Sequence, residues 1–522
     1  MSKDDAAQRE KRATPLTGTQ WTVLALLTLC MFLVVLDATV VLIALPAIMS
    51  DLDGTLTSAT WIPAGFALAF AAFLLMFGKL TDVHGRRRMF VVGLVLFTVA
   101  SLAAGLAPSM EFLIGARVVQ GVGAAIIEPA IIALIKASFP ADRLGLAFGV
   151  EGLAAGLAGA GGPIVGGLLA TTLSWRYIFF INLPIGVLAI VAAYLLISES
   201  RDEGADRRLD LAGVLLSGSG LFALVFGIVQ GTEYGWGSAP IITSFAAAAV
   251  LLVLFVVVEG RVANPLLDLS LFRYRLFAVG NYLRGAVEFI SLAIFFPLVL
   301  FLQVGLGYTP LRAGLTLLPF IVGAVIASPL AGSLSDRVDL RWPVVPGMFA
   351  SAAALFWLAH LSPGSGWAEL IAPLFASGLA LGTLYGPTTS GSLKEIPTEK
   401  AGVASAVSYG AVLIGFELGI AVTSSVLQSR FAGELEDAPA SAALPEGAVD
   451  EMASALLTGE GETGGVQLSA ALQRAIEASL AHAANAAVLA CAAMAVAGGI
   501  IGLFFAPRKG RATVPVGEES TA

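Results

Sequence analysis

Apolar runs of about 20 residues recur along the chain and decide what it can fold into. A helix rises about 1.5 Å per residue, so about 20 residues cross the hydrocarbon core of a bilayer. Of the 522 residues, 57% are hydrophobic and only 13% are charged, which is typical of a polytopic membrane protein. We predict an all-α membrane protein with fourteen transmembrane helices. The predicted spans are 21–46, 60–80, 88–107, 111–133, 143–170, 176–197, 211–230, 240–259, 276–302, 311–334, 343–361, 368–392, 401–428 and 478–505.

Lysine and arginine predict the orientation of these helices. In membrane proteins the short cytoplasmic loops carry an excess of both residues. With the N-terminus inside, about 23 of the 29 Lys and Arg residues fall on the cytoplasmic side. Residues 1–20 are polar, and the first apolar run is too long for the core of a signal peptide. We therefore expect both termini in the cytoplasm and the chain in a bacterial cytoplasmic (plasma) membrane.

Charge and residue usage exclude several classes of function. The net charge of −8 and the absence of a long basic run predict no nucleic-acid partner. The two cysteines and three histidines are scattered, so we predict no disulfide framework, no metal site and no catalytic cluster. The sequence has no nucleotide-binding loop of the Gly-x4-Gly-Lys-Ser/Thr type, which argues against an ATP-driven protein.

Two loops of similar sequence indicate an internal repeat. The loop from Gly78 reads GKLTDVHGRRR and the loop from Gly332 reads GSLSDRVDLRW. Both share Gly-x-Leu-x-Asp followed by basic residues, and their separation of 254 residues fits two six-helix halves with two helices between them. We therefore predict an N-terminal six-helix bundle over 1–200, two linker helices over 201–262 and a C-terminal six-helix bundle over 263–522.

Glycine recurs at spacings of four and three residues in the predicted helix 143–170, which places a bare stripe on one face. Small residues let a neighbouring membrane helix approach closely. The same helix contains Glu151, an ionisable group in an apolar span. The stripe is either a tight structural contact or a sliding surface beside a group that binds protons. Its members are Gly145, Gly149, Gly152, Gly156 and Gly159, and Pro163 and Gly166 continue the spacing.

Several motifs occur in order on the predicted helices, and together they resemble the major facilitator superfamily. Within it, the sequence is most similar to the fourteen-helix drug:proton antiporters of the EmrB/QacA type. Leu42 stands where that family usually has Asn, and the loop at Gly332 lacks the glycine that Gly85 supplies in the first half. The motifs are Leu36–Pro46 on the first helix, Gly78–Arg88 after the second, Arg117–Gly123 on the fourth, Gly159–Gly167 on the fifth and Trp175–Pro184 on the sixth.

The resemblance implies the major facilitator fold and a function. The fold would be two six-helix bundles plus two linker helices, working by alternating access. The function would be proton-coupled antiport that exports small amphipathic, cationic drugs. The partners would be a small-molecule substrate, protons and the lipid bilayer. Such a transporter needs the proton gradient and no cofactor, and one chain with both halves can work as a monomer. The fifth-helix motif characteristic of antiporters corresponds to Gly159, Gly162, Pro163, Gly166 and Gly167.

The loop at Gly78 is a candidate conformational latch. It carries Asp82 and the basic residues Arg86 and Arg87, and Gly85 permits a tight turn. A charge cluster here can hold one half against the other when the protein faces outward and release it when the protein faces inward. Alternatively, the basic residues only set the membrane topology.

Asp37 and Arg117 are candidates for proton coupling or substrate binding in the first half. A charged side chain inside a membrane helix is costly, so it usually pairs or lines a wet cavity. Counting residues along helices places both side chains in the outer half of the membrane at similar depth. We expect them to face the same cavity and to interact. The alternative is that each only anchors helix contacts.

Four glutamates complete the set of intramembrane carboxylates. Glu128 and Glu151 lie at comparable depth, and two nearby carboxylates in a low dielectric favour binding of a proton near neutral pH. Arg284 and Glu288 are four residues apart and are expected to pair with each other. Glu417 is isolated from basic residues in sequence and can attract a cationic substrate. Ring faces for a cation or a flat drug can come from Tyr385, Tyr409, Phe289, Phe295 and Phe296, although ordinary core or lipid-facing packing is favoured for each ring alone.

Other interpretations stay open at this point. The long outer loop 429–476 is acidic and either a partly disordered or amphipathic surface segment or a segment used in substrate access or in binding a periplasmic partner. The cargo is either a range of drugs or one specific metabolite, antibiotic or lipid. A membrane enzyme would need a catalytic or metal cluster that the sequence lacks, and the two-half repeat argues against a channel or sensor.

Overall fold

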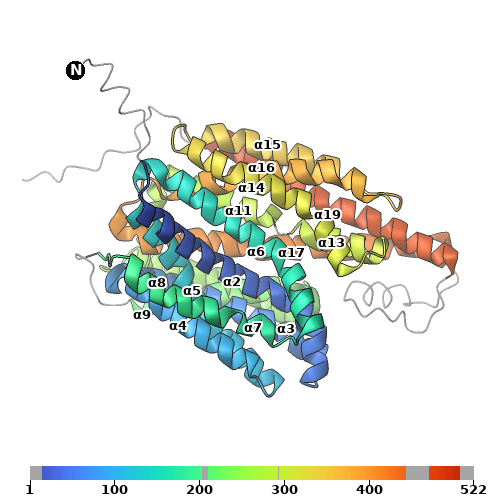
Figure 1. Ribbon diagram of the computed structural model, residues 1–522, viewed down its shortest axis with the longest axis horizontal. Coiled ribbons are helices and arrows are strands. Elements are labelled where there is room, and N and C mark those ends of the chain that lie inside the picture. The colour runs from blue at the N-terminus through green and yellow to red at the C-terminus, as the bar shows by residue number, and fades with distance from the viewer. Residues whose placement is uncertain (1–14, 203–209, 292, 442–468, 506–522) are drawn as a thin grey trace, which may run out of the picture.

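The computed structural model describes residues 15–202, 210–291, 293–441 and 469–505, and these residues form an all-helical fold (Figure 1). Each of the fourteen predicted ranges is helical. Twelve helices among the described residues are long and apolar enough to cross a membrane. The helices at the two other ranges, α6 and α15, have 29 and 18 residues and are not among these twelve. The predicted count of fourteen spanning helices is therefore not confirmed.

The helices fall into two packed groups and one pair. The first group is α2 (Gly18–Asp51), α3 (Leu56–His84), α4 (Arg86–Gly105), α5 (Met110–Ser138), α6 (Leu144–Thr172), α7 (Tyr177–Phe180) and α8 (Asn182–Leu196). The second group is α11 (Arg275–Ser291), α12 (Phe295–Leu300), α13 (Pro310–Thr316), α14 (Leu318–Ser335), α15 (Arg341–Leu358), α16 (Trp367–Leu393), α17 (Ala401–Glu436) and α19 (Ala470–Phe505). The pair is α9 (Leu211–Tyr234) and α10 (Ala239–Glu259), and α9 packs against α3 and α17.

Three predicted spans are interrupted rather than continuous. The range 176–197 divides into α7 and α8, 276–302 into α11, α12 and a π-helical turn, and 311–334 into α13 and α14. In each case a new helix begins one or two residues before a proline, at Pro184, Pro297 and Pro319. Proline lacks an N–H group, so it is tolerated in the first turn of a helix and not in its interior.

The predicted outer loop 429–476 is shorter than expected at both ends. Helix α17 continues to Glu436 and α19 begins at Ala470. The physical reason is burial, because Phe431 and Leu435 are four residues apart and continue the apolar face of α17 into the core. Residues 442–468, which carry part of the predicted acidic segment, lie outside the described residues.

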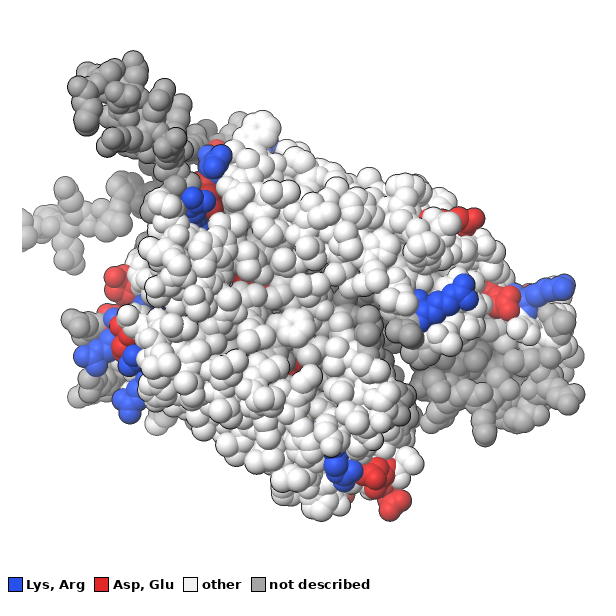
Figure 2. All heavy atoms as spheres, in the orientation of Figure 1, with Lys and Arg blue, Asp and Glu red and all other residues white. Residues whose placement is uncertain are grey.

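The charged side chains gather at the two ends of the molecule, and the face between them is almost entirely uncharged (Figure 2). We call the end that carries Gly85 and Asp336 the Gly85 end, and the opposite end, where Arg176 binds Asp51, the Arg176 end. The first group's hydrophobic core does not stop at its own helices. At the Gly85 end it includes Leu393 and Val403 of the second group. The two groups are therefore packed together at the Gly85 end.

Candidate functional site

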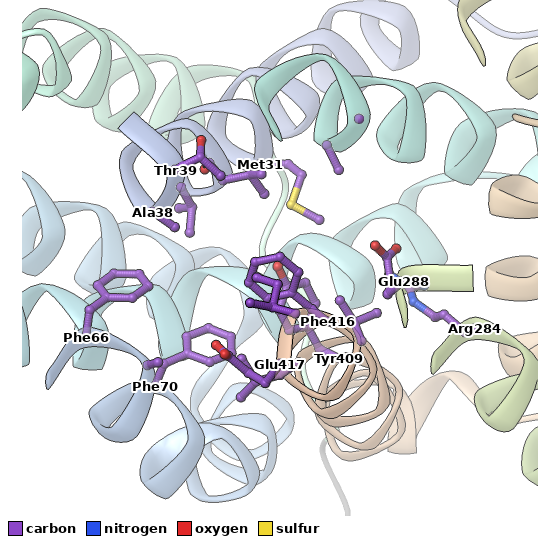
Figure 3. A pocket seen from close by; sticks show the side chains of 18 of the residues that line it. Met31, Ala38, Thr39, Phe66, Phe70, Arg284, Glu288, Tyr409, Phe416 and Glu417 are labelled. Atoms are coloured by element: carbon purple, nitrogen blue, oxygen red, sulfur yellow. The ribbon is translucent and has the colours of Figure 1, made fainter. Parts of the chain in front are cut away.

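A cavity of about 290 Å³ lies between the two groups (Figure 3). Its walls come from α2, α3, α5 and α6 of the first group, from α11, α16 and α17 of the second, and from α9. The lining is mainly apolar and aromatic, which suits an amphipathic organic molecule. Five charged residues contribute to it from both groups. They are Arg117, Glu151, Arg284, Glu288 and Glu417.

The aromatic lining was only partly predicted. Of the five candidate rings, Tyr385 and Tyr409 line the cavity. The predicted phenylalanines of α11 and α12 do not belong to its lining, because Phe289 is buried in the core and Phe295 packs edge-on against Phe320. The third, at position 296, is 37% exposed and also outside the lining. The rings that replace them are Phe66, Phe70 and Phe416.

A charged pair on the lining of the cavity joins the two groups. Arg284 Nη2 lies 4.0 Å from Glu151 Oε1, and Arg284 Nη1 donates a hydrogen bond of 2.5 Å to Thr389 Oγ1. We expected Arg284 to pair with Glu288 on its own helix, and this expectation was wrong in the choice of partner. A spacing of four residues allows a pair but cannot exclude a nearer carboxylate from another helix. Glu288 lines the same cavity beside Arg284 (Figure 3).

Asp37 and Arg117 interact as predicted, within the first group. Arg117 Nη1 forms an ion pair with Asp37 Oδ2 and donates to Gln120 Oε1 at 2.7 Å. Asp37 Oδ1 accepts from Gln120 Nε2 at 2.9 Å and from Asn182 Nδ2 at 2.6 Å. The expectation that both face the cavity was wrong for Asp37, which is 1% exposed and does not line it. Arg117 contributes to the lining beneath the ring of Phe66.

The remaining two predicted carboxylates have different surroundings. Glu128 is fully buried on α5, does not line the cavity, and neither of its carboxylate oxygens has a hydrogen-bond partner among the described residues. A buried carboxylate without hydrogen-bond partners is costly, so Glu128 remains a candidate for the predicted role in proton coupling. Glu417 lines the cavity, and its carboxylate points towards Phe70 (Figure 3).

Two carboxylates cap helices of the opposite group at the Gly85 end. Asp82, at the end of α3, accepts from the backbone N–H groups of Gly402 at 2.7 Å and Val403 at 3.0 Å, in the first turn of α17. Asp336, after α14, accepts from Gly145 at 2.7 Å and Leu146 at 3.2 Å, in the first turn of α6. A negative charge is stabilised at a helix N-terminus. Burial raises the pKa of Asp336 to about 6, although the two N–H groups oppose the rise.

The other residues of the predicted latch differ in which of the two groups they contact. Arg86 binds Asp82 at 3.2 Å and donates to the carbonyl oxygen of Thr398, so it also reaches the second group. A Cβ at Gly78 would lie 2.5 Å from Ala406 Cβ, and Gly85 adopts a positive φ of 107° as the predicted turn requires. Arg87 instead donates to the Ile197 carbonyl oxygen, within the first group.

Lys136 also crosses between the groups, and the sequence analysis missed it. Its Nζ donates to the carbonyl oxygens of Leu393, at 2.5 Å, and Ile396, at the C-terminal end of α16. A cation is stabilised at a helix C-terminus, because the last carbonyl groups lack partners within the helix. The signal in the sequence was a lysine at the end of an apolar span, which we counted only as a topology determinant.

Removing the Asp82 charge is expected to open the contact at the Gly85 end. Asp82→Asn keeps the shape but loses a charge-assisted cap worth about 1.5–3 kcal/mol, so the open fraction should rise about tenfold or more. The measurement is the rate of maleimide labelling at Ser335→Cys, a buried position at this contact, in detergent. The background carries Cys30→Ala and Cys491→Ala, and the exposed Glu399→Gln serves as the matched control. An unchanged labelling rate in Asp82→Asn would contradict the latch.

The glycine stripe of α6 packs closely against the second group from Gly145 to Gly152. A Cβ at Gly145 would lie 2.3 Å from the Gly332 carbonyl oxygen, at Gly149 2.7 Å from the Ser328 carbonyl oxygen, and at Gly152 2.7 Å from Tyr385 Cβ. At Gly156 it would meet nothing within 4 Å, and Gly156 lines the cavity. The close packing of these glycines against α14 and α16 therefore ends at Gly152, where the cavity begins, and α13 of the second group also contacts α6.

The residues of the fifth-helix motif lie further along α6, and Gly162 among them faces its own group. A Cβ at Gly162 would lie 2.2 Å from Thr39 Oγ1 of α2. Gly159 and Gly166 are buried, Gly167 is partly buried, and the side chain of Pro163 lies outside the described residues. At Gly162, the close contact is therefore made with α2 and not with the second group.

Comparison with known proteins identifies the family. The model of the Major Facilitator Superfamily matches residues 27–420. The chain belongs to the major facilitator superfamily. The membership predicted from the motifs is thus confirmed, and proteins of this superfamily are multi-pass membrane transporters rather than enzymes.

The relatives of this major facilitator protein include exporters of antibiotics. It is 34% identical over 433 residues to the tetracenomycin C resistance and export protein of Streptomyces glaucescens, covering 83% of this chain and 80% of the relative. It is 36% identical over 408 residues to the multidrug resistance protein Stp of Mycobacterium tuberculosis, covering 78% and 75%. Its fold matches the crystal structure of the human organic anion transporter MFSD10 with a TM-score of 0.60 and 12% identity, covering 92% and 99% of the two chains.

Proposed function

We propose that this protein is a proton-coupled antiporter that exports small amphipathic, cationic drugs or toxic compounds by alternating access. The observation that carries the proposal is the meeting of Glu151 and Arg284, from opposite groups, in one apolar and aromatic cavity. This charged contact exists only while the two groups are together. Binding of a ligand at either residue is therefore coupled to the relative movement of the groups. Binding of a proton or of a cation at Glu151 would change the same contact.

The cavity's charges support a cationic cargo. Asp37 balances Arg117, and Arg284 balances Glu151, which leaves Glu288 and Glu417 as carboxylates on the lining. Carboxylates attract a cation, and the rings of Phe70, Phe416 and the two lining tyrosines offer faces for it. Protons and cargo would compete for these carboxylates, as antiport requires.

The proposed function implies an orientation of the chain in the membrane and a division into two bundles and a linker. The bundles are 1–200 and 263–522, joined by the linker helices within 201–262, and the working unit is a monomer. Both termini and the Gly85 end face the cytoplasm. The structure then corresponds to a state that is closed to the cytoplasm by the Asp82, Asp336 and Lys136 contacts.

A dedicated exporter of one antibiotic, metabolite or lipid is the second candidate. It is favoured by relatives whose names refer to single compounds, such as the tetracenomycin C exporter and the cephamycin export protein of Amycolatopsis lactamdurans, which is 33% identical over 425 residues. A panel of cationic, neutral and anionic compounds would separate the two candidates. Export of one compound alone would favour the dedicated exporter.

The proposed function predicts the behaviour of four carboxylate variants. In inverted vesicles with an imposed pH gradient, we expect uptake of ethidium by wild type with release of protons. Glu151→Gln should lower this flux at least tenfold, because the cavity loses the carboxylate that faces Arg284 of the opposite group. Glu128→Gln and Asp37→Asn test the proton sites outside the lining, and Glu417→Gln should mainly weaken ethidium affinity.

The controls separate folding from coupling. Each variant is compared with Glu399→Gln, an exposed carboxylate at the Gly85 end, at equal amounts of monodisperse protein. Ethidium flux that is independent of the pH gradient in wild type would contradict proton coupling. Full activity in all four variants would contradict the carboxylate mechanism.

A further inference from the structure

Arg284 is held so that it faces Glu151 without being bound tightly to it. The side chain is buried, and its guanidinium group lies 4.0 Å from Glu151 Oε1, beyond hydrogen-bond distance. Its short hydrogen bond is to Thr389 of α16, in its own group. Glu151 Oε1 has no hydrogen-bond partner among the described residues. The positive charge of Arg284 therefore lies close to the Glu151 carboxylate, but Glu151 Oε1 can still accept a hydrogen bond from another donor.

The other groups around Glu151 cannot supply its counter-charge. The ionisable side chains near it on other helices are Glu128, Glu288 and Tyr409, which are acidic or neutral. Among the described residues that line the cavity, the second cation is Arg117, and it is committed to Asp37. In this state Arg284 is therefore the counter-ion that balances the negative charge of Glu151.

The contact between Glu151 and Arg284 changes when the two groups move. Glu151 lies on α6 next to Gly152, whose Cβ position is 2.7 Å from Tyr385 Cβ of the second group. Arg284 lies on α11 and is tied to α16, so it moves with the second group. Separation at the Gly85 end would take Arg284 away and leave Glu151 as an unpaired carboxylate in the membrane, which is costly.

We propose that Arg284 is a tethered competitor of the cargo, taking the place at Glu151 that the cation of the cargo takes in the other state. This inference rests on the proposed function and names the step that releases the cargo. When the groups close at the Gly85 end, the guanidinium returns to Glu151. Two cations cannot share one carboxylate without repulsion, so Arg284 displaces the cargo towards the Arg176 end. No proton needs to reach Glu151 for this release.

The test uses purified full-length protein and ethidium as the probe, with fluorescence titration for binding and vesicle uptake for transport. Arg284→Gln should bind ethidium at least tenfold more tightly than wild type, and its maximal rate should fall at least tenfold together with KM. Arg284→Lys, which keeps the charge, should restore most of the rate. Arg284→Met gives the same test if the glutamine variant does not fold.

A double variant tests whether Arg284 and ethidium compete for Glu151 itself. In Glu151→Gln the further change Arg284→Gln should no longer tighten ethidium binding, because there is no carboxylate to compete for. Unchanged or weaker binding in Arg284→Gln, with normal wild-type transport, would overturn this inference and leave the proposed function standing. Wild type without gradient-driven ethidium transport would contradict the proposed function and this inference together.

Discussion

Gly145→Ala is expected to lower transport at least tenfold, whereas Gly156→Ala, which adds its methyl group to the wall of the cavity, is expected to lower it much less. Both glycines belong to the same stripe of α6, and the added methyl group is the same. At Gly145 a Cβ would lie 2.3 Å from the carbonyl oxygen of Gly332, and that atom is backbone that cannot rotate away. At Gly156 the same Cβ meets nothing within 4 Å.

The physical cause is overpacking of one conformational state. Forcing a methyl group into a tight contact costs about 1–3 kcal/mol, which changes the balance of two states by about 5-fold to about 150-fold. Alanine in place of glycine stabilises an isolated helix by about 1 kcal/mol, so a loss of transport cannot come from weaker helix formation. The state with the Gly85 end closed would be depleted, and the cycle would stop.

The comparison is made by ethidium uptake in vesicles with equal amounts of each variant. Gly332→Ala provides a reciprocal test, since its Cβ would lie 2.2 Å from the Gly145 carbonyl oxygen. It should resemble Gly145→Ala. Equal transport by Gly145→Ala and Gly156→Ala would show that the close approach at Gly145 is not needed for the cycle.

Arg117→Met is expected to destabilise the protein by about 3–5 kcal/mol, because it leaves Asp37 as a buried charge without its counter-ion. Arg117 is fully buried, and Asp37 has no contact with solvent that could replace it. The double variant Arg117→Met with Asp37→Leu should recover part of this loss, since both charges are then removed together. Thermal unfolding in detergent, followed by light scattering or tryptophan fluorescence, measures the difference.

An exposed ion pair supplies the matched control. Lys400 Nζ lies 2.5 Å from Asp268 Oδ2, and the two side chains are 46% and 34% exposed. Lys400→Met should cost less than about 1 kcal/mol, because water screens exposed pairs. A loss in Arg117→Met no larger than in Lys400→Met would mean that Asp37 is neutral in the folded protein.

The parts of the site that the sequence predicted well depend on distances along a helix. Depth in the membrane follows from residue counting, and it brought Asp37 and Arg117 together correctly. The repeat of Gly78 and Gly332 likewise pointed to two equivalent loops. Helix ranges were also predictable, because apolar length alone marks a membrane span.

The parts that were missed depend on contacts between helices. Nothing in the spacing of Arg284 and Glu288 indicates that a carboxylate of α6 lies closer to the arginine. The acceptors of Lys136 are backbone carbonyl groups, which leave no trace in residue types. The same holds for the N–H groups that Asp82 and Asp336 bind. These partners are set by how the two groups pack, and helix patterns do not contain that information.

The division of the α6 stripe at Gly152 makes this helix a lever with unequal arms. From Gly145 to Gly152 the arm is about 10 Å, and from Gly152 to Thr172 it is about 30 Å, at about 1.5 Å per residue. A rotation about Gly152 that parts the helices by about 3 Å at the short end sweeps about 10 Å at the long end. Glu151 lies next to this pivot, whereas Arg284 lies on α11 and moves with the second group. One rotation would therefore both pass access from one face of the membrane to the other and bring Arg284 to or from a carboxylate that itself moves little.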